Sequence, residues 1–180
     1  MGDSCIMIVL LNVSKEEVAP IKDKILSYLT SRKVIKELET DCTLDGQGFP
    51  PSERFREVVK DKDGTLLKLK VNGLSIHSGQ RTIFSSNGID EINCPKFGNN
   101  IIDFDWGAAL DEWINESDGD KIECPNCGET NIVVDYVFNP PWAFGEFGLT
   151  FWNWPPFEDF FIEQLEAEIG KKVKVILGKL

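Results

Sequence analysis

The C-terminal segment of the chain constrains the fold more than any other feature. Residues 148–154 are strand-like, with apolar side chains on both faces, and two prolines end this segment. Four apolar residues then recur at intervals of four: Phe157, Phe161, Leu165 and Ile169. This spacing predicts a helix with one apolar face, which Gly170 ends, and residues 173–177 form an apolar run typical of a strand. The segment therefore predicts strand, helix and strand in that order.

The N-terminal segment has a similar pattern. Residues 5–13 are a continuous apolar run and predict a buried strand. Ser14 and Glu17 have the spacing of a capping box, and apolar residues recur at helical spacing to about Arg32. We expect Pro20 to distort the first turn of this helix.

Between these ends the pattern is less regular. Residues 39–53 contain two glycines and two prolines and predict a long irregular connection. Residues 65–76 alternate apolar and polar side chains about Asn72-Gly73, which predicts a hairpin. Residues 80–85 and 131–138 are strand-like, and residues 105–114 have the spacing of a short helix.

Together these elements predict an α+β fold, a two-layer sandwich of an antiparallel or mixed sheet with helices on one face. A length of 180 residues corresponds to about one domain. We therefore predict a single domain over residues 1–180, with a zinc-ribbon-like insert at residues 90–138.

The insert is predicted from two similar cysteine turns. Cys124-Pro125-Asn126-Cys127-Gly128 places two thiols two residues apart, a spacing that lets both sulfurs hold one zinc ion. Cys94-Pro95-Lys96-Phe97-Gly98 has the same frame, with Phe97 in place of the second cysteine. Three thiolates leave a tetrahedral site one ligand short.

Three outcomes remain open for these cysteines. His77, Cys42, an aspartate or water could complete the zinc site, the turns could persist without metal, or Cys124 and Cys127 could act as a redox pair. We rank the metal-free remnant above zinc, and the redox pair last, since no thioredoxin-like pattern surrounds the motif. The sequence nominates no general base, so we expect a bound zinc to be structural.

Aromatic residues are concentrated near the C-terminus. Ten of the 19 aromatic residues lie between Phe138 and Phe161. Trp142, Trp152 and Trp154 are candidates for a protein-binding or homodimer surface, because exposed tryptophans often anchor interfaces. The alternative, which we favour, is that Trp106 and Trp113 of the insert cover this strand as a second small core.

The composition excludes several partners. The chain has 19 Lys and Arg against 30 Asp and Glu, a net charge of −11. This charge disfavours nucleic acid and anionic membranes and favours a basic protein partner. The first residues lack the basic start of a signal peptide, and five cysteines do not resemble a disulfide framework, so we expect a cytoplasmic protein with reduced thiols.

The aromatic and cysteine motifs also carry a resemblance. The string W-A-F-G-E-F-G-L-T-F-W-N-W-P-P-F from Trp142, the ending V-K-V-I-L-G-K-L, the C-P-x-C-G turns and Asp-Glu-Trp at residues 111–113 resemble a family of small uncharacterised bacterial proteins. The resemblance implies no established activity. It implies a full cysteine pair in the first turn, from which Phe97 departs.

Two functions of different class follow. The sequence contains no nucleophile elbow, phosphate-binding loop, dinucleotide fingerprint or zinc-protease motif. We therefore favour a non-catalytic cytoplasmic protein-binding module, of the immunity or adaptor type, with an acidic surface. The alternative is a zinc-dependent enzyme or regulator that uses Cys94, Cys124 and Cys127 with one further ligand.

Overall fold

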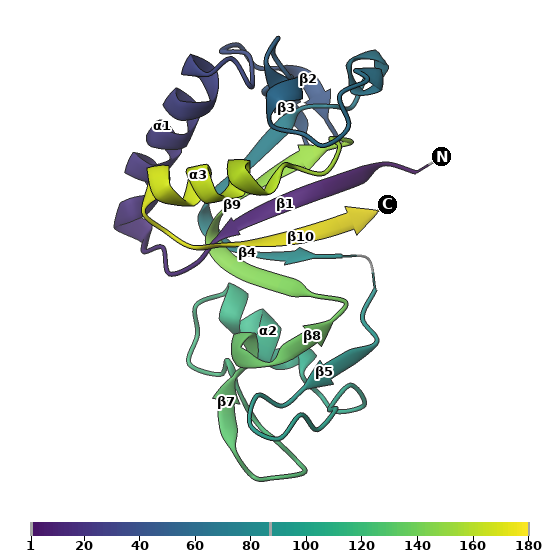
Figure 1. Cartoon of the computed structure of the whole chain (residues 1–180). Helices are drawn as coiled ribbons and strands as arrows, with labels where there is room; N and C mark the ends of the chain where they lie inside the picture. Colours follow the sequence, from purple (N-terminus) through teal and green to yellow (C-terminus); the bar gives the residue numbers. More distant parts are fainter. Residues whose placement is uncertain (1, 87, 180) are drawn as a thin grey trace.

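A four-stranded antiparallel sheet is the centre of the computed structural model, which describes residues 2–86 and 88–179. Its strand order is β10-β1-β9-β4. The strands are β1 (Ser4–Leu10), β4 (Leu74–Ser85), β9 (Trp142–Trp152) and β10 (Val173–Lys179) (Figure 1). All three pairings are antiparallel, so the α+β class is confirmed and the alternative of a mixed sheet is wrong.

Two helices cover one face of this sheet (Figure 1). They are α1 (Lys15–Ser31) and α3 (Asp159–Ile169). Alternate residues of β1, namely Ile6, Ile8 and Leu10, share their core, because successive side chains of a strand point to opposite faces. The predicted capping contact is present, with the Ser14 N–H donating to Glu17 Oε2 over 2.9 Å.

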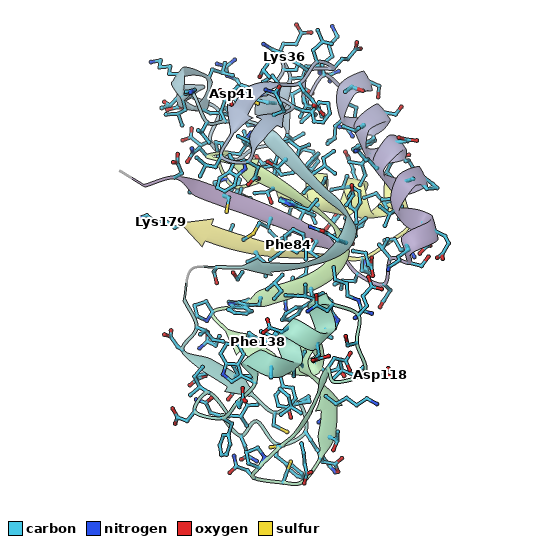
Figure 2. All side chains as sticks on the ribbon, turned by 180° about the vertical axis from the view of Figure 1, so that it is seen from behind. Lys36, Asp41, Phe84, Asp118, Phe138 and Lys179 are labelled. Carbon is cyan, nitrogen blue, oxygen red and sulfur yellow. The ribbon has the colours of Figure 1, made fainter. Side chains whose placement is uncertain are left out.

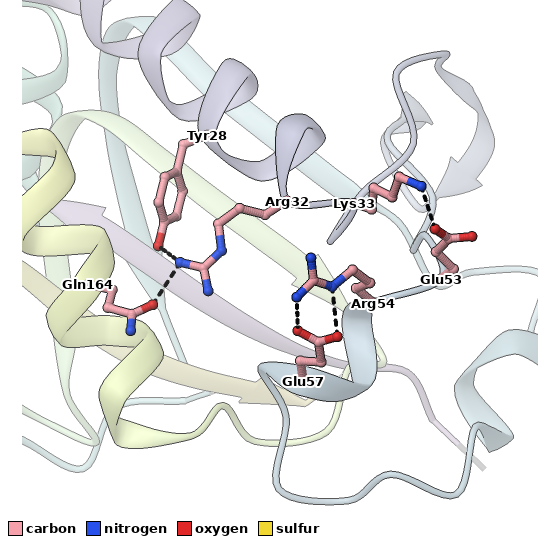
Figure 3. Close-up of polar contacts among 7 residues, drawn as sticks. All are labelled: Tyr28, Arg32, Lys33, Glu53, Arg54, Glu57 and Gln164. Atoms are coloured by element: carbon pink, nitrogen blue, oxygen red, sulfur yellow. Dashed lines mark hydrogen bonds and ion pairs between the residues drawn. The ribbon is translucent and has the colours of Figure 1, made fainter.

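A polar contact joins the two helices near the C-terminus of α1. Arg32 Nη1 donates to the Tyr28 hydroxyl and, over 2.7 Å, to Gln164 Oε1 of α3 (Figure 3). The ion pairs Lys33–Glu53 and Arg54–Glu57 lie nearby with more than half of each side chain exposed. Exposed pairs add little stability, so the apolar core and not these contacts holds the helices on the sheet.

The other face of the sheet is covered by the far end of its own strands β4 and β9. The paired strands β4 and β9 form a two-stranded ribbon whose register shifts between Ser78 and Thr82. Beyond this irregularity the β4–β9 ribbon curls over β1. Phe84 from the curled end packs with Met7 and Val9 of β1. Gly148 provides the room, since a Cβ there would lie 2.3 Å from Phe84 Cζ.

A separate unit is attached to the end of this ribbon (Figures 1 and 2). Ser85 pairs with Trp142, so residues 86–141 leave and rejoin the sheet at adjacent positions. The unit contains β5 (Glu91–Asn93), α2 (Gly107–Ile114), β6 (Lys121–Glu123), β7 (Thr130–Ile132), a 3-10 turn (Val133–Asp135) and β8 (Val137–Asn139). It has its own core, formed around Ile92, Ile101, Leu110 and Trp113.

The predictions for the middle of the chain need two corrections. Residues 39–53 are not wholly irregular, because β2 (Thr40–Thr43) and β3 (Gly46–Gly48) form a small hairpin. The predicted hairpin about Asn72-Gly73 is wrong. Residues Thr65–Lys68 form a 3-10 turn, and the N–H groups of Asn72 and Gly73 both donate to the Cys42 carbonyl.

Three smaller differences concern the course and the bounds of single elements. Pro20 lies inside α1, which continues through it without a break. The predicted helix over 105–114 is shorter, since α2 begins at Gly107 and Trp106 precedes its first residue. The predicted strand over 131–138 is divided into β7, the 3-10 turn and β8. Within the described residues, no helix is long and apolar enough to cross a membrane.

Candidate metal centre

The two cysteine turns have the same backbone geometry. The Gly98 N–H donates to the Cys94 carbonyl over 2.8 Å, and the Gly128 N–H donates to the Cys124 carbonyl over the same distance. Both glycines have positive φ, 70° and 71°, a region that favours residues without a Cβ. The similarity of the two sequence frames therefore corresponds to a similarity of structure.

A further pair of hydrogen bonds closes each turn onto its own strand. The Cys94 N–H donates to the Asn99 carbonyl over 2.9 Å, and the Cys124 N–H donates to the Glu129 carbonyl over 2.8 Å. The first turn thus projects from β5, and the second connects β6 to β7. Hydrogen bonds of the N–H and the carbonyl thus hold the backbones of Cys94 and Cys124 in place.

The turns bring three sulfurs together. The ligand atoms of Cys94, Cys124 and Cys127 lie within 4.8 Å of one another, and the sulfurs of Cys94 and Cys127 are 3.7 Å apart. A tetrahedral zinc ion with Zn–S bonds of about 2.3 Å holds its sulfurs about 3.8 Å apart. The three sulfurs are therefore close enough to bind a metal ion.

The protein environment affects these thiols differently. Backbone N–H groups of Phe97 and Lys96 face the Cys94 sulfur and lower the pKa of that thiol. Burial, together with hydrogen bonds from Cys124 and Cys94, raises the pKa of Cys127 to about 12. Three thiolates this close repel one another, so without a cation the cluster keeps a proton.

The cluster lacks a fourth protein ligand among residues 2–86 and 88–179. Phe97 has no donor atom, and its side chain is 63% exposed. His77 lies on β4 and its Nε2 is 2.9 Å from Thr150 Oγ1. Cys42 is buried beside β3, where its Sγ is 3.2 Å from the Gly48 carbonyl. Neither of these two candidates joins the site.

The unit that contains the cluster carries almost all of the net negative charge. Residues 90–138 contain two lysines and twelve Asp or Glu residues, a net charge of −10, whereas the rest of the chain has a net charge of −1. Ten of the twelve acidic residues are exposed, and Asp120 and Glu129 are partly buried. This distribution is readable in the sequence, but only if the charge is counted separately for the insert.

The candidate tryptophans lie largely in the interior. Trp152 and Trp154 are 7% and 4% exposed, and their indole N–H groups donate to Ser75 Oγ and the Asn72 carbonyl. Trp142 is partly buried and stacks on Phe138 with ring centroids 4.9 Å apart. A binding role for these residues stays a prediction, but other side chains of the surface would have to make most of the contact.

The favoured alternative for the aromatic segment holds only for the start of β9, because Trp152 and Trp154 belong to the cores of the main sheet and not to the core of the insert. Trp106 packs edge-on against Trp142 at 6.3 Å, and Trp113 packs against Phe144 of β9 at 5.5 Å. Arg81 reinforces this contact, because its guanidinium lies over the Trp113 ring and donates to the Trp113 carbonyl. The insert therefore packs on the start of β9 through a second aromatic core.

A second concave site lies on the helix-free face. A cavity of about 230 Å³ there is lined in part by Cys5, His77 and Thr150. Burial lowers the pKa of His77 and raises the pKa of the Cys5 thiol. Both shifts favour the neutral forms of these two side chains.

Comparisons of the chain with protein-family models, with curated proteins and with solved structures find no match.

Proposed function

We propose that this chain is a non-catalytic, cytoplasmic protein-binding module whose unit 90–138 binds a basic protein partner. The concentration of charge carries this proposal, since a net charge of −10 lies on this unit and −1 on the remainder. A compact acidic surface attracts a basic partner over a distance and disfavours nucleic acid and anionic membranes.

The surface of the unit has the composition that such a contact needs. Within the described residues, only Glu116 and Glu129 of its twelve acidic residues form ion pairs, with Lys15 and Lys96. The same unit exposes several large apolar side chains: Phe97, Phe104, Ile114, Ile132 and Val137. Apolar contacts surrounded by charges are typical of protein interfaces.

Although the sequence alone ranks a metal-free remnant first, we propose that the cysteine cluster holds a structural zinc ion in this module. The 3.7 Å separation of the Cys94 and Cys127 sulfurs supports zinc, because a tetrahedral ion needs about this distance. The ion would tie the turn after β5 to the turn between β6 and β7. Short strands of three residues each have little stability alone, so this cross-link has a clear physical role.

The partner proposal is tested by neutralising charge in two places. In one variant, four exposed acids of the unit become amides: D103N, D105N, D111N and E112Q. In a matched control, four acids outside the unit become amides: D23N, D61N, D159N and E163Q. A protein captured by the wild type should bind the first variant at least about tenfold more weakly and the control with unchanged affinity. Equal binding by both variants, or no specific protein, would contradict the proposal.

The zinc proposal is tested by elemental analysis of purified protein. We expect close to one zinc per chain in the wild type and none in a C124S/C127S variant. A C5S variant is the control, because Cys5 lies on β1 and outside the cluster. Protein that stays metal-free after incubation with zinc would show that the turns hold together by packing alone.

A further inference from the structure

The fourth coordination position of the proposed zinc ion has no ligand from the described part of the chain. Cys94, Cys124 and Cys127 are the only His, Cys, Asp or Glu residues in the cluster. Phe97 occupies the turn position that Cys127 has in the other turn, but its ring offers no lone pair. Three sulfurs leave a tetrahedral ion open at this one position.

The cluster lies next to an exposed surface at Phe97 and Cys127. The Phe97 ring is 63% exposed and lies under Lys96 Nζ, which is 5.3 Å from the ring centroid. Lys96 also pairs with Glu129 beside the second turn. Cys127 is the least buried of the three cysteines, so the cluster is covered on the side of Cys94 and Cys124 and accessible on the side of Cys127.

The surrounding charge selects the kind of donor. A zinc ion with three thiolates carries one net negative charge, and the unit around it has a charge of −10. A fourth anionic donor would add repulsion, whereas a neutral nitrogen donor adds none. Imidazole is the common neutral nitrogen ligand for zinc in proteins.

We propose that a metal ion at these three cysteines keeps one exchangeable position and that the imidazole of a partner's histidine binds there. This inference rests on the zinc site and basic partner proposed above. In the exchange, a nitrogen lone pair forms a bond to the metal as a bound water leaves, and no electron or net proton is transferred. His77 is the only histidine of the chain and lies on β4 beside Thr150, so a second copy does not readily supply the ligand.

Cobalt provides the test, because its visible absorption reports the ligands of a tetrahedral site. The wild-type chain loaded with Co²⁺ is titrated with free imidazole, and we expect a saturable shift of the absorption bands. F97C should bind Co²⁺ with four thiolates and show no response to imidazole. F97H should show the imidazole-bound spectrum before any imidazole is added. Both substitutions are at an exposed position, so they leave the fold intact.

Two peptides distinguish a partner's histidine from a small imidazole ligand. One is Lys-Lys-His-Lys-Lys and the other has alanine in place of histidine. The histidine peptide should shift the cobalt spectrum at about tenfold lower concentration than free imidazole, because weak ion pairs add to the coordination bond. The alanine peptide should leave the spectrum unchanged, and salt should remove the advantage of the histidine peptide.

The outcomes separate the two levels of the proposal. Failure to bind Co²⁺ or Zn²⁺ at all would overturn the metal site itself. Binding of Co²⁺ with a spectrum that imidazole does not change would leave the metal site standing and overturn the open position. A histidine peptide no better than free imidazole would overturn the assignment to a protein partner.

Discussion

At the scale of single residues, Gly148 and Phe84 explain how the sheet covers its own second face. A Cβ at position 148 would lie 2.3 Å from Phe84 Cζ, far inside van der Waals contact. The Phe84 ring therefore occupies the space that any other residue at 148 would fill. Two positions that are far apart in the sequence thus determine how tightly the β4–β9 ribbon curls.

Gly148→Ala tests this contact. We expect the free energy of unfolding in urea to fall by about 1–3 kcal/mol, because the added methyl group overpacks a buried site. Gly107→Ala is the control, since a Cβ at Gly107 has no atom within 4 Å and lies in α2. Equal stability of the G148A variant and the wild type would show that the ribbon can shift without cost.

His77 predicts a second residue-scale effect, on the pH dependence of stability. Burial lowers its pKa below the unperturbed value of 6.5, so the unfolded chain takes up the proton more readily than the folded chain. The free energy of unfolding should therefore be largest above pH 6.5 and fall as the pH drops below it. His77→Gln should reduce this slope.

The measurement is urea unfolding of the wild type and H77Q at pH 7.5 and 5.5. The stability difference between the two proteins should change with pH, while contributions from other groups cancel. A constant difference would mean that His77 has the same pKa in the folded and unfolded chains.

At the scale of elements, the β4–β9 ribbon is the part on which the rest depends. At one end of the ribbon, β9 pairs with β1 beneath the helices. The other end of the ribbon carries the unit 90–138. Because Ser85 and Trp142 are direct antiparallel partners, the ribbon could be closed by a two-residue turn. The sheet and its two helices therefore do not need the insert for their connectivity.

Replacing residues 86–141 with Asn-Gly tests this independence. Trp142 and Phe144 become Thr in the same variant, since both side chains would lose their cover from the insert. We expect a folded protein with one cooperative unfolding transition and no metal binding. Dye-binding, loosely packed protein without a cooperative transition would show that the insert is needed for folding.

At the scale of the whole molecule, the chain has two main cores with different support. The core under α1 and α3 contains large buried side chains such as Phe147, Phe151 and Phe161. The core of the insert is built on strands of three residues and one short helix. We therefore expect a metal ion bound at Cys94, Cys124 and Cys127 to stabilise the second core much more than the first.

Metal removal measured by hydrogen exchange tests this expectation. A chelator should accelerate exchange of the β5 and β8 amides by about tenfold or more and leave the β1 amides almost unchanged, because bound ligand stabilises only the unit that holds it. The C124S/C127S variant is the control and should exchange rapidly with or without chelator. Uniform acceleration across the chain would indicate one cooperative unit.

Much of this architecture is predictable from local pattern. Local sequence specifies α3 and β10 directly, through the helical spacing after Pro156, the glycine at position 170 and the apolar run at the C-terminus. The prediction failed at Asn72-Gly73, where the donors of the turn bond to Cys42 from another segment. Local preference could not reveal this, because the competing partner is 30 residues away.

The sequence by itself determined the α+β class, the terminal strands and helices, and the matched cysteine turns, since each depends on residues close together in the chain. Only the tertiary structure decided that Trp152 and Trp154 are buried and that Cys94 lies 3.7 Å from Cys127. It also decided that the ribbon folds back on its own sheet. These features depend on contacts between distant segments, and the pattern within one segment contains no information about which distant surface will cover it.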